Sequence, residues 1–378
     1  LSPSRARGAI LAWPCLWGDD LMRILRLLSD EGKHRSGISW LILAVIFVIG
    51  LPLRMQNMGL AGYVSDDGWW HYRQIKQVVD YGHRLNPDPY EFVTLGRDLT
   101  YPPVFHYALG WAYKLLGRPA GLSLIEFTHY FNLAEYLAYV LLVYFICRTI
   151  SASSMWSLLG PLSVAVSYGM IIRARSGELM AFVLADIFAL AGLGIFLSLR
   201  NASLENKRRY IAKMSLGGVL LGLSLLTWQG AFLVWLPPAL FLIAVLAWQG
   251  RALSRRPALA PGAVALMVIF GLAVIWYLPI ILRYGINPHS REMSWFMKMT
   301  VLHKTMPWRF YFLSCGAAIL AVPFVLFRIM RYDVVARMFL VFWAVQGLVA
   351  ALSGWRGYLA VAPIITSVML GICVKKTR

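Results

Sequence analysis

Residues 38–53 read ISWLILAVIFVIGLPL, and no charged side chain interrupts them. A helix needs about 20 mostly apolar residues to cross the roughly 30 Å hydrocarbon core of a bilayer, and this stretch approaches that length. Hydrophobic residues make up 59% of the 378-residue chain and charged residues 14%, whereas soluble domains contain about 45–50% and 25%. A single soluble core also stops growing at about 250–300 residues. The sequence therefore predicts a polytopic membrane protein.

Similar apolar stretches recur along the whole chain. The predicted spans cover residues 38–53, 127–147, 154–172, 179–199, 212–228, 231–249, 262–282, 310–327, 334–353 and 356–374. The aromatic-rich stretch Tyr101–Leu116 is shorter and is predicted to form a short or interfacial helix. The pattern predicts an all-α fold with about ten transmembrane helices.

Basic residues between the spans orient the chain. With the N-terminus in the cytoplasm, most of the 36 Lys and Arg residues fall in short inner loops, as the positive-inside rule requires. The outer side then carries two long polar segments, 54–126 and 283–309, where function is expected. The net charge of +19 reflects this topology, so no nucleic-acid partner is predicted.

The predicted domain organisation follows from this topology. Residues 1–37 form a cytoplasmic N-terminal tail, and residues 38–378 form the transmembrane domain in a bacterial inner membrane or plasma membrane. The chain opens on Leu1, and Met22 begins a plausible basic start, so residues 1–21 are interpreted as a possible gene-model extension.

Two adjacent acids follow the first span. Residues 65–73 read SDDGWWHYR, which places Asp66 and Asp67 just beyond the membrane surface. Neighbouring carboxylates suit a hard divalent cation, which prefers oxygen ligands and offsets their repulsion. Asp is also a preferred residue at the start of a helix or in a solvated turn. The residues by themselves are compatible with either role.

This segment, followed by Gly82-His83 and by Tyr101-Pro102-Pro103, resembles the first outer loop of the oligosaccharyltransferase catalytic subunits. These are membrane enzymes of the C-type glycosyltransferase superfamily and include single-subunit bacterial and archaeal forms. The resemblance implies that Asp67 is the metal-binding and catalytic aspartate and that Asp66 lies beside it in the metal site.

The same resemblance implies residues that bind the sugar donor. His71 and Arg73 match an H-x-R element of the family pattern. Arg173 and Gly177 match an R-x-x-x-G element, after which the family has two acids that complete the metal site. Here only Glu178 follows, so the resemblance implies a metal-binding Glu178 in a reduced motif. The alternative to a metal-binding role is that Glu178 lies at the start of the next helix because the helix dipole attracts an acid there.

Two further matches lie nearer the C-terminus. Glu292, in HSREM at 289–293, resembles a family glutamate that approaches the acceptor amide, and an ordinary exposed glutamate is the alternative. In the family, an arginine that contacts the donor pyrophosphate precedes a span by a fixed distance from a proline. Arg356 precedes Pro363 in the same order and at the same distance. An arginine at a helix end can instead extend to the interface merely to keep its charge in water.

The resemblance implies a metal-dependent transferase that moves a glycan from a polyprenyl-linked donor to an asparagine of an acceptor polypeptide. The expected cofactor is Mg²⁺ or Mn²⁺, and membrane lipid is the expected surrounding. The family's soluble C-terminal acceptor-recognition domain, with its W-W-D-Y-G motif, is absent from these residues. The alternatives are a C-type transferase that modifies a lipid or polysaccharide, and a transporter of lipid-linked sugars.

Overall fold

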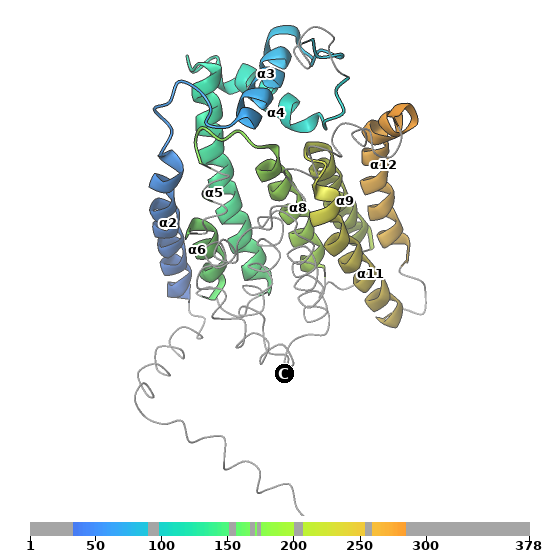
Figure 1. Cartoon of the computed structure of the whole chain (residues 1–378). Helices are drawn as coiled ribbons and strands as arrows, with labels where there is room; N and C mark the ends of the chain where they lie inside the picture. Colours follow the sequence, from blue (N-terminus) through green and yellow to red (C-terminus); the bar gives the residue numbers. More distant parts are fainter. Residues whose placement is uncertain are drawn as a thin grey trace, which may run out of the picture.

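The computed structural model describes residues 33–89, 98–150, 156–166, 171, 175–199, 207–253 and 259–284 (Figure 1). These residues form helices joined by loops. The helices are α2 (Lys33–Met55), α3 (Asp66–Tyr81), α4 (Val104–Ala112), the π-helical turn η2 (Tyr113–Gly117), α5 (Leu124–Ile150), the 3₁₀ turn η3 (Trp156–Leu158), α6 (Leu159–Val166), α8 (Ala181–Ser198), α9 (Lys207–Thr227), α10 (Ala231–Val234), α11 (Leu236–Leu253) and α12 (Leu259–Tyr284).

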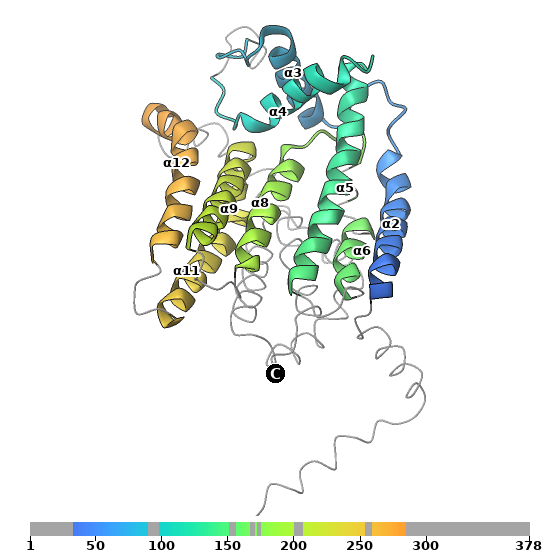
Figure 2. The same cartoon turned by 180° about the vertical axis from the view of Figure 1, so that it is seen from behind.

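The long helices run side by side as one bundle, and α3 and α4 lie across one end of it (Figures 1 and 2). In the described part of the chain, α2, α5, α8, α9 and α12 are each long and apolar enough to cross a membrane. The protein is therefore an integral membrane protein, and α3 and α4 lie in the segment predicted to face outward.

The predicted spans compare with these helices as follows. The span predicted at 231–249 is divided into α10 and α11, and Pro237-Pro238 stand in the first turn of α11, where proline costs a helix little. Within the span predicted at 154–172, the structure describes η3 and the short helix α6. Tyr101–Leu116 forms α4 and most of η2, as predicted for a short helix. The last three predicted spans lie outside the described residues.

Small residues allow α8, α9 and α12 to approach closely. A Cβ atom added to Gly192 of α8 would lie 2.9 Å from the Gly217 carbonyl oxygen of α9. One added to Gly218 would lie 2.9 Å from the Ala265 carbonyl oxygen of α12. Helices in lipid associate through such backbone contacts, because apolar side chains gain little by leaving a lipid environment.

Arg54, one residue before the end of α2, is fully buried without a carboxylate partner among the described residues. Its guanidinium donates to the Val164 and Ala165 carbonyls in the last turn of α6, at 2.8 and 2.9 Å, and to the Gly50 carbonyl at 3.0 Å. It also lies 3.8 Å from the centre of the Tyr136 ring of α5. A cation near a helix C-terminus is favourable. Arg54 thus joins three helices towards the end of the bundle that carries α3 and α4, which is called the outer end after the predicted topology.

We expect Arg54→Leu to lower the free energy of unfolding by about 3 kcal/mol, because buried carbonyls lose a charged donor and gain nothing in its place. Thermal unfolding of the detergent-solubilised protein measures this change. Arg118→Leu is the matched control, since Arg118 is exposed in the outer segment. Equal melting temperatures for the two variants would contradict this role of Arg54.

Candidate functional site

The first turn of α3 carries both predicted acids. Ser65 is the N-cap of α3, and its Oγ accepts a hydrogen bond from the Gly68 amide at 3.2 Å. Neither Asp66 nor Asp67 is therefore needed as the cap. Both are exposed, and neither makes a hydrogen bond or ion pair to a described residue. Two unengaged carboxylates thus stand at the outer end of the bundle.

The turn at residues 175–178 is tied directly to this segment. The Val64 amide donates to the Gly177 carbonyl at 2.9 Å, and the Ser176 amide donates to the Arg54 carbonyl at 2.6 Å. Gly177 has φ +82°, and a Cβ atom there would lie 3.0 Å from Asn57 Cβ. A residue with a side chain would meet both a strained backbone and a close contact. The fold thus brings together two motifs that lie about a hundred residues apart.

Glu178 in this turn is buried, and its Oε1 lies 3.2 Å from the guanidinium of Arg175. The amide of Asn132, from α5, donates to the Arg175 and Glu178 carbonyls at 3.1 and 2.7 Å. The Glu178 Oε2 atom is also buried and has no hydrogen-bond partner. Glu178 is therefore held in place with one oxygen still available.

The chemistry of these acids suits a divalent cation, since all three offer hard oxygen atoms. However, no three His, Cys, Asp or Glu residues of the described part come close enough together to hold a metal ion. The described part of the chain therefore shows no complete metal site, and the predicted metal-binding role of these acids stays a prediction. Arg173, Glu292 and Arg356 lie outside the described residues.

His71 belongs to a buried chain of three side chains. Its Nδ1 lies 2.9 Å from the Nε2 of His106, which α4 supplies, and the His106 Nδ1 lies 3.1 Å from a guanidinium nitrogen of Arg84. An arginine can only donate, so His106 Nδ1 accepts and its Nε2 carries the proton. His71 Nδ1 then accepts from His106. This hydrogen-bond pattern assigns both rings the neutral Nε2–H form.

The surroundings keep both histidines neutral. Burial, reinforced by Arg84, lowers the pKa of His71 to about 3. Burial lowers the pKa of His106 well below its usual range, with further contributions from His71 and Arg84. His71 lies one turn after Asp67 on α3, and its ring is buried whereas Asp67 is exposed. The neutral ring keeps its Nε2–H as a hydrogen-bond donor at any physiological pH.

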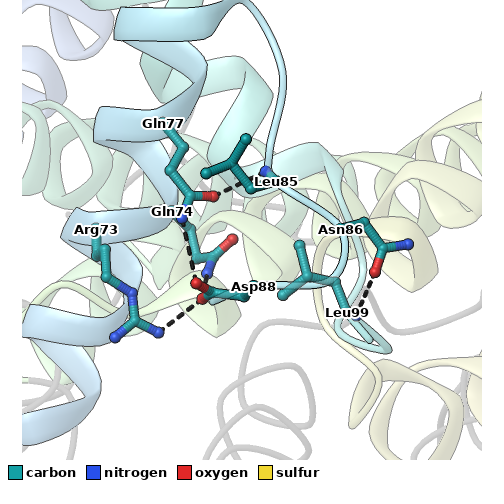
Figure 3. Close-up of polar contacts among 7 residues, drawn as sticks. All are labelled: Arg73, Gln74, Gln77, Leu85, Asn86, Asp88 and Leu99. Atoms are coloured by element: carbon teal, nitrogen blue, oxygen red, sulfur yellow. Dashed lines mark hydrogen bonds and ion pairs between the residues drawn. The ribbon is translucent and has the colours of Figure 1, made fainter. Parts of the chain in front are cut away.

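Arg73 holds a loop in place. It forms a 2.7 Å ion pair with Asp88, which is fully buried, and Gln74 and Gln77 donate to the same carboxylate at 2.5 and 3.4 Å (Figure 3). Gln77 also accepts from the Leu85 amide at 2.9 Å. The structure therefore gives Arg73 a positioning role in the outer segment, and its contact with the donor stays a prediction.

Sequence reasoning missed the partners of the predicted residues. His106 and Arg84 complete the chain to His71, and Arg175 pairs with Glu178. Arg84 directly follows the Gly82-His83 pair that forms part of the resemblance, and His106 lies three residues after Pro103. The signal available in the sequence was that Arg84, a cationic residue, and His106, an imidazole, flank the motifs that carry the resemblance.

Inside the bundle, Asp186 of α8 accepts a 2.5 Å hydrogen bond from the indole of Trp235, which is almost fully buried. Glu135 of α5 lies within electrostatic reach of Asp186. Asp186 therefore links α8 to the segment between α10 and α11.

The arrangement of helices is shared with two kinds of solved structure. Archaeal oligosaccharyltransferase AglB from Archaeoglobus fulgidus, in complex with an inhibitory peptide and a dolichol-phosphate, matches with a TM-score of 0.66 and 15% identity over 90% of this chain and 50% of that one. The same oligosaccharyltransferase with Zn and sulfate matches with a TM-score of 0.62 and 16% identity, over 88% and 48% of the two chains.

ArnT from Cupriavidus metallidurans, bound to undecaprenyl phosphate, matches with a TM-score of 0.58 and 16% identity, over 91% of this chain and 60% of that one. No family model and no curated protein sequence matches the chain. The structural matches confirm the predicted all-α, polytopic membrane fold, which the chain shares with AglB and ArnT. The chain spans about half the length of the oligosaccharyltransferase chains that it matches.

Gly177→Ala tests the contact between the two motifs. We expect a loss of about 1–2 kcal/mol in the free energy of unfolding from the positive φ and roughly another 1 kcal/mol from the contact with Asn57. Gly82→Ala is the matched control, because Gly82 has the same φ of +82° and nothing within 4 Å of its added Cβ. Chemical denaturation of the two variants measures the difference, and an equal loss would contradict close packing at Gly177.

A second prediction concerns pH. Unfolded His71 binds a proton below its usual pKa of about 6.5, whereas the folded residue binds one only near pH 3. The stability contributed by the neutral ring is therefore complete above about pH 7. It falls by up to about 1.4 kcal/mol for each pH unit between about 6.5 and 3.

Hydrogen–deuterium exchange at pH 7.5 and 5.0, corrected for the intrinsic rate, measures this loss. Peptides of α3 and α4 should exchange faster at pH 5.0, while peptides of α9, which contains no histidine, should not change. Equal responses of α3 and α9 would argue against the buried neutral pair.

Proposed function

We propose that the protein is a glycosyltransferase that uses a polyprenyl-linked sugar donor at the outer face of the membrane. The observation that carries this proposal is the pair of exposed carboxylates, Asp66 and Asp67, held beside the 175–178 turn at one end of a membrane bundle. The fold shared with AglB and ArnT supports it, since these structures contain dolichol-phosphate and undecaprenyl phosphate.

The finer proposal is oligosaccharyl transfer to an asparagine side chain. The bond between the anomeric carbon and the phosphate oxygen breaks, and the polyprenyl pyrophosphate leaves with the electron pair. A new bond forms from the same carbon to the amide nitrogen, which loses one proton to the carboxylate of Asp67. Asp67 and Glu292 are proposed to accept hydrogen bonds from the amide N–H groups, because an amide nitrogen is a poor nucleophile that needs activation.

The donor phosphates need hydrogen-bond donors and positive charge. The neutral Nε2–H of His71 is proposed to donate to them without a change of protonation, and Arg173, Arg73 and Arg356 are proposed to supply cations. Such preorganised donors stabilise charge that develops on a leaving group. The planar guanidinium of arginine suits this role, because it binds two phosphate oxygens at once.

A divalent cation, Mg²⁺ or Mn²⁺, is proposed at Asp66, Asp67 and Glu178, with further ligands from outside the described residues. When bound, it would supply positive charge to the departing phosphate. Support comes from the free oxygens of Asp66 and Asp67 and from the unpartnered Oε2 of Glu178. The similar oligosaccharyltransferase structure that contains Zn and sulfate supports a divalent cation, without bearing on its identity.

The acceptor and the topology complete the proposal. An acceptor polypeptide is favoured by the motif resemblance and by the inhibitory peptide bound to AglB. Transfer to a lipid or polysaccharide is the second candidate, because the resemblance to the C-type transferases also allows it. The N-terminal tail is proposed to be cytoplasmic, and residues 54–126 and 283–309 are proposed to lie outside a bacterial inner membrane or plasma membrane.

Asp67→Asn tests the function. With a polyprenyl-pyrophosphate-linked oligosaccharide, a peptide that contains Asn-x-Thr and added Mn²⁺, we expect the rate of glycopeptide formation to fall at least about 100-fold, because the amide loses its proton acceptor. Mass spectrometry of the peptide and the donor lipid measures the reaction. Asp80→Asn is the matched control, since Asp80 lies on the same helix in an exposed pair with Lys76.

The outcomes separate the candidates. Glycopeptide formed by wild type and lost only in Asp67→Asn supports transfer to asparagine. Sugar moved to a lipid acceptor while the peptide stays unmodified supports the second candidate. Unchanged turnover by Asp67→Asn would remove Asp67 from the site.

A further inference from the structure

Trp69, in the first turn of α3, stands at the surface beside the two exposed acids. Its side chain is 45% exposed, and it lies three residues after Asp66 on the same side of the helix. The adjacent Trp70 differs, because its ring packs against those of His71 and His106. One tryptophan of this pair therefore belongs to the buried histidine chain, and the other belongs to the surface around the acids.

The exposed indole is held in one place by its neighbours. A Cβ atom added to Gly62 would lie 2.8 Å from Trp69 Cη2, so the edge of the indole rests directly on the Gly62 backbone. The indole plane is also perpendicular to the rings of Tyr63 and Tyr72, with ring centres 5.3 and 5.9 Å away. Such edge-to-face pairs are the favoured geometry of aromatic side chains, so these contacts fix the ring.

The residues that support the indole are themselves attached to the bundle. Tyr63 is buried, and its hydroxyl group is hydrogen-bonded to the Thr128 hydroxyl group of α5. The next residue, Val64, donates its amide to the Gly177 carbonyl at 2.9 Å, in the turn that contains Glu178. Trp69 is thus fixed to the same elements as the candidate acids, and a ligand that packs on it has little ordering cost to overcome.

An aromatic ring that is firmly held yet left in water calls for an explanation, because exposed apolar surface is unfavourable. A tryptophan at the boundary between lipid and water is the ordinary one. However, α3 lies across the end of the bundle and not among the spanning helices (Figures 1 and 2). Lipid phosphates would also repel the carboxylates of Asp66 and Asp67, which carry the same charge. A polar ligand with an apolar face fits this surface better.

An aromatic ring next to a carboxylate suits a sugar. A pyranose has a face formed largely by C–H groups, and its hydroxyl groups lie around its edge. The C–H face packs on the electron-rich face of an aromatic ring. An ionised carboxylate accepts hydrogen bonds at both oxygens, so an acid beside the ring can bind a hydroxyl group and still contact a cation. The Trp69 indole N–H, which donates to no described residue, offers a further hydrogen bond.

We propose that Trp69 is the surface on which the sugar next to the donor phosphate packs, and that Asp66 accepts a hydrogen bond from one of its hydroxyl groups. This inference rests on the proposed function, because it concerns the sugar of the polyprenyl-linked donor. It adds a selectivity that the acids alone do not supply. The protein binds the lipid that carries a sugar more tightly than the same lipid without one.

Binding measurements on the full chain, in a detergent that has no sugar head group, test this proposal. The probes are undecaprenyl diphosphate that carries one N-acetylhexosamine and undecaprenyl diphosphate alone, each with added Mn²⁺. We expect wild type to bind the glycosylated lipid about tenfold more tightly. In Trp69→Ala this preference should disappear, while the Kd for the sugar-free lipid stays unchanged.

Trp111→Ala is the matched control. Trp111 is 49% exposed in the same outer segment, but its ring is covered by the ammonium group of Lys114, 4.8 Å from the ring centre. This variant should keep the full preference for the glycosylated lipid.

Two milder variants keep the test valid if Trp69→Ala disturbs the packing of Tyr63 and Tyr72. Trp69→Phe retains an aromatic ring and should retain part of the preference. Gly62→Ala retains the tryptophan, but its methyl group displaces the edge of the indole, so the preference should fall. Hydrogen exchange of α3 peptides shows whether each variant keeps its fold.

The outcomes separate this inference from the proposed function. Wild type that binds both lipids equally would overturn the sugar contact and leave the proposed function standing. Wild type that binds neither lipid would contradict the proposed function, and the inference with it. The role of Trp69 would also be overturned by an equal loss for both lipids in Trp69→Ala, by an unchanged preference in that variant, or by the same loss in Trp111→Ala.

Discussion

A buried cation satisfied by backbone carbonyls is the contact on which the outer end of the bundle depends. Inside a bilayer no water is available to pair exposed carbonyls, so each must find a donor within the protein. Arg54 of α2 supplies donors to the last turn of α6, and its own carbonyl accepts from Ser176. One residue therefore links the first helix, a neighbouring helix and the turn that carries Glu178.

The outer segment is organised around α3 by two buried polar groups of residues. In the first group, the carboxylate of Asp88 is surrounded by Arg73, Gln74 and Gln77, and these contacts fix the loop that follows α3. In the second group, His71 of α3 contacts His106 of α4, which in turn contacts Arg84. This chain joins α3 to α4. A helix held along its length presents its first turn rigidly. The exposed acids there owe their position to contacts made farther along α3.

Much of this architecture could be predicted from the sequence. The apolar stretches located α2, α5, α8, α9 and α12, because in lipid only a continuous apolar helix satisfies its own backbone. The motif at residues 65–73 located the two acids, and the preference of Asp for the start of a helix agrees with the beginning of α3 at Asp66, although Ser65 is the cap. The predicted roles of Arg173, Glu292 and Arg356 remain predictions.

The sequence by itself determined the membrane environment, the helical class and the segment that bears the acids, because hydropathy and capping are local properties of the chain. Only the tertiary structure decided that Gly177 packs against Val64, that Arg73 pairs with Asp88, and that Arg84 and Trp276 line one hollow. These partners lie between 15 and 192 residues apart in the sequence. Their contact depends on how the helices pack, and no local pattern of residues encodes that packing.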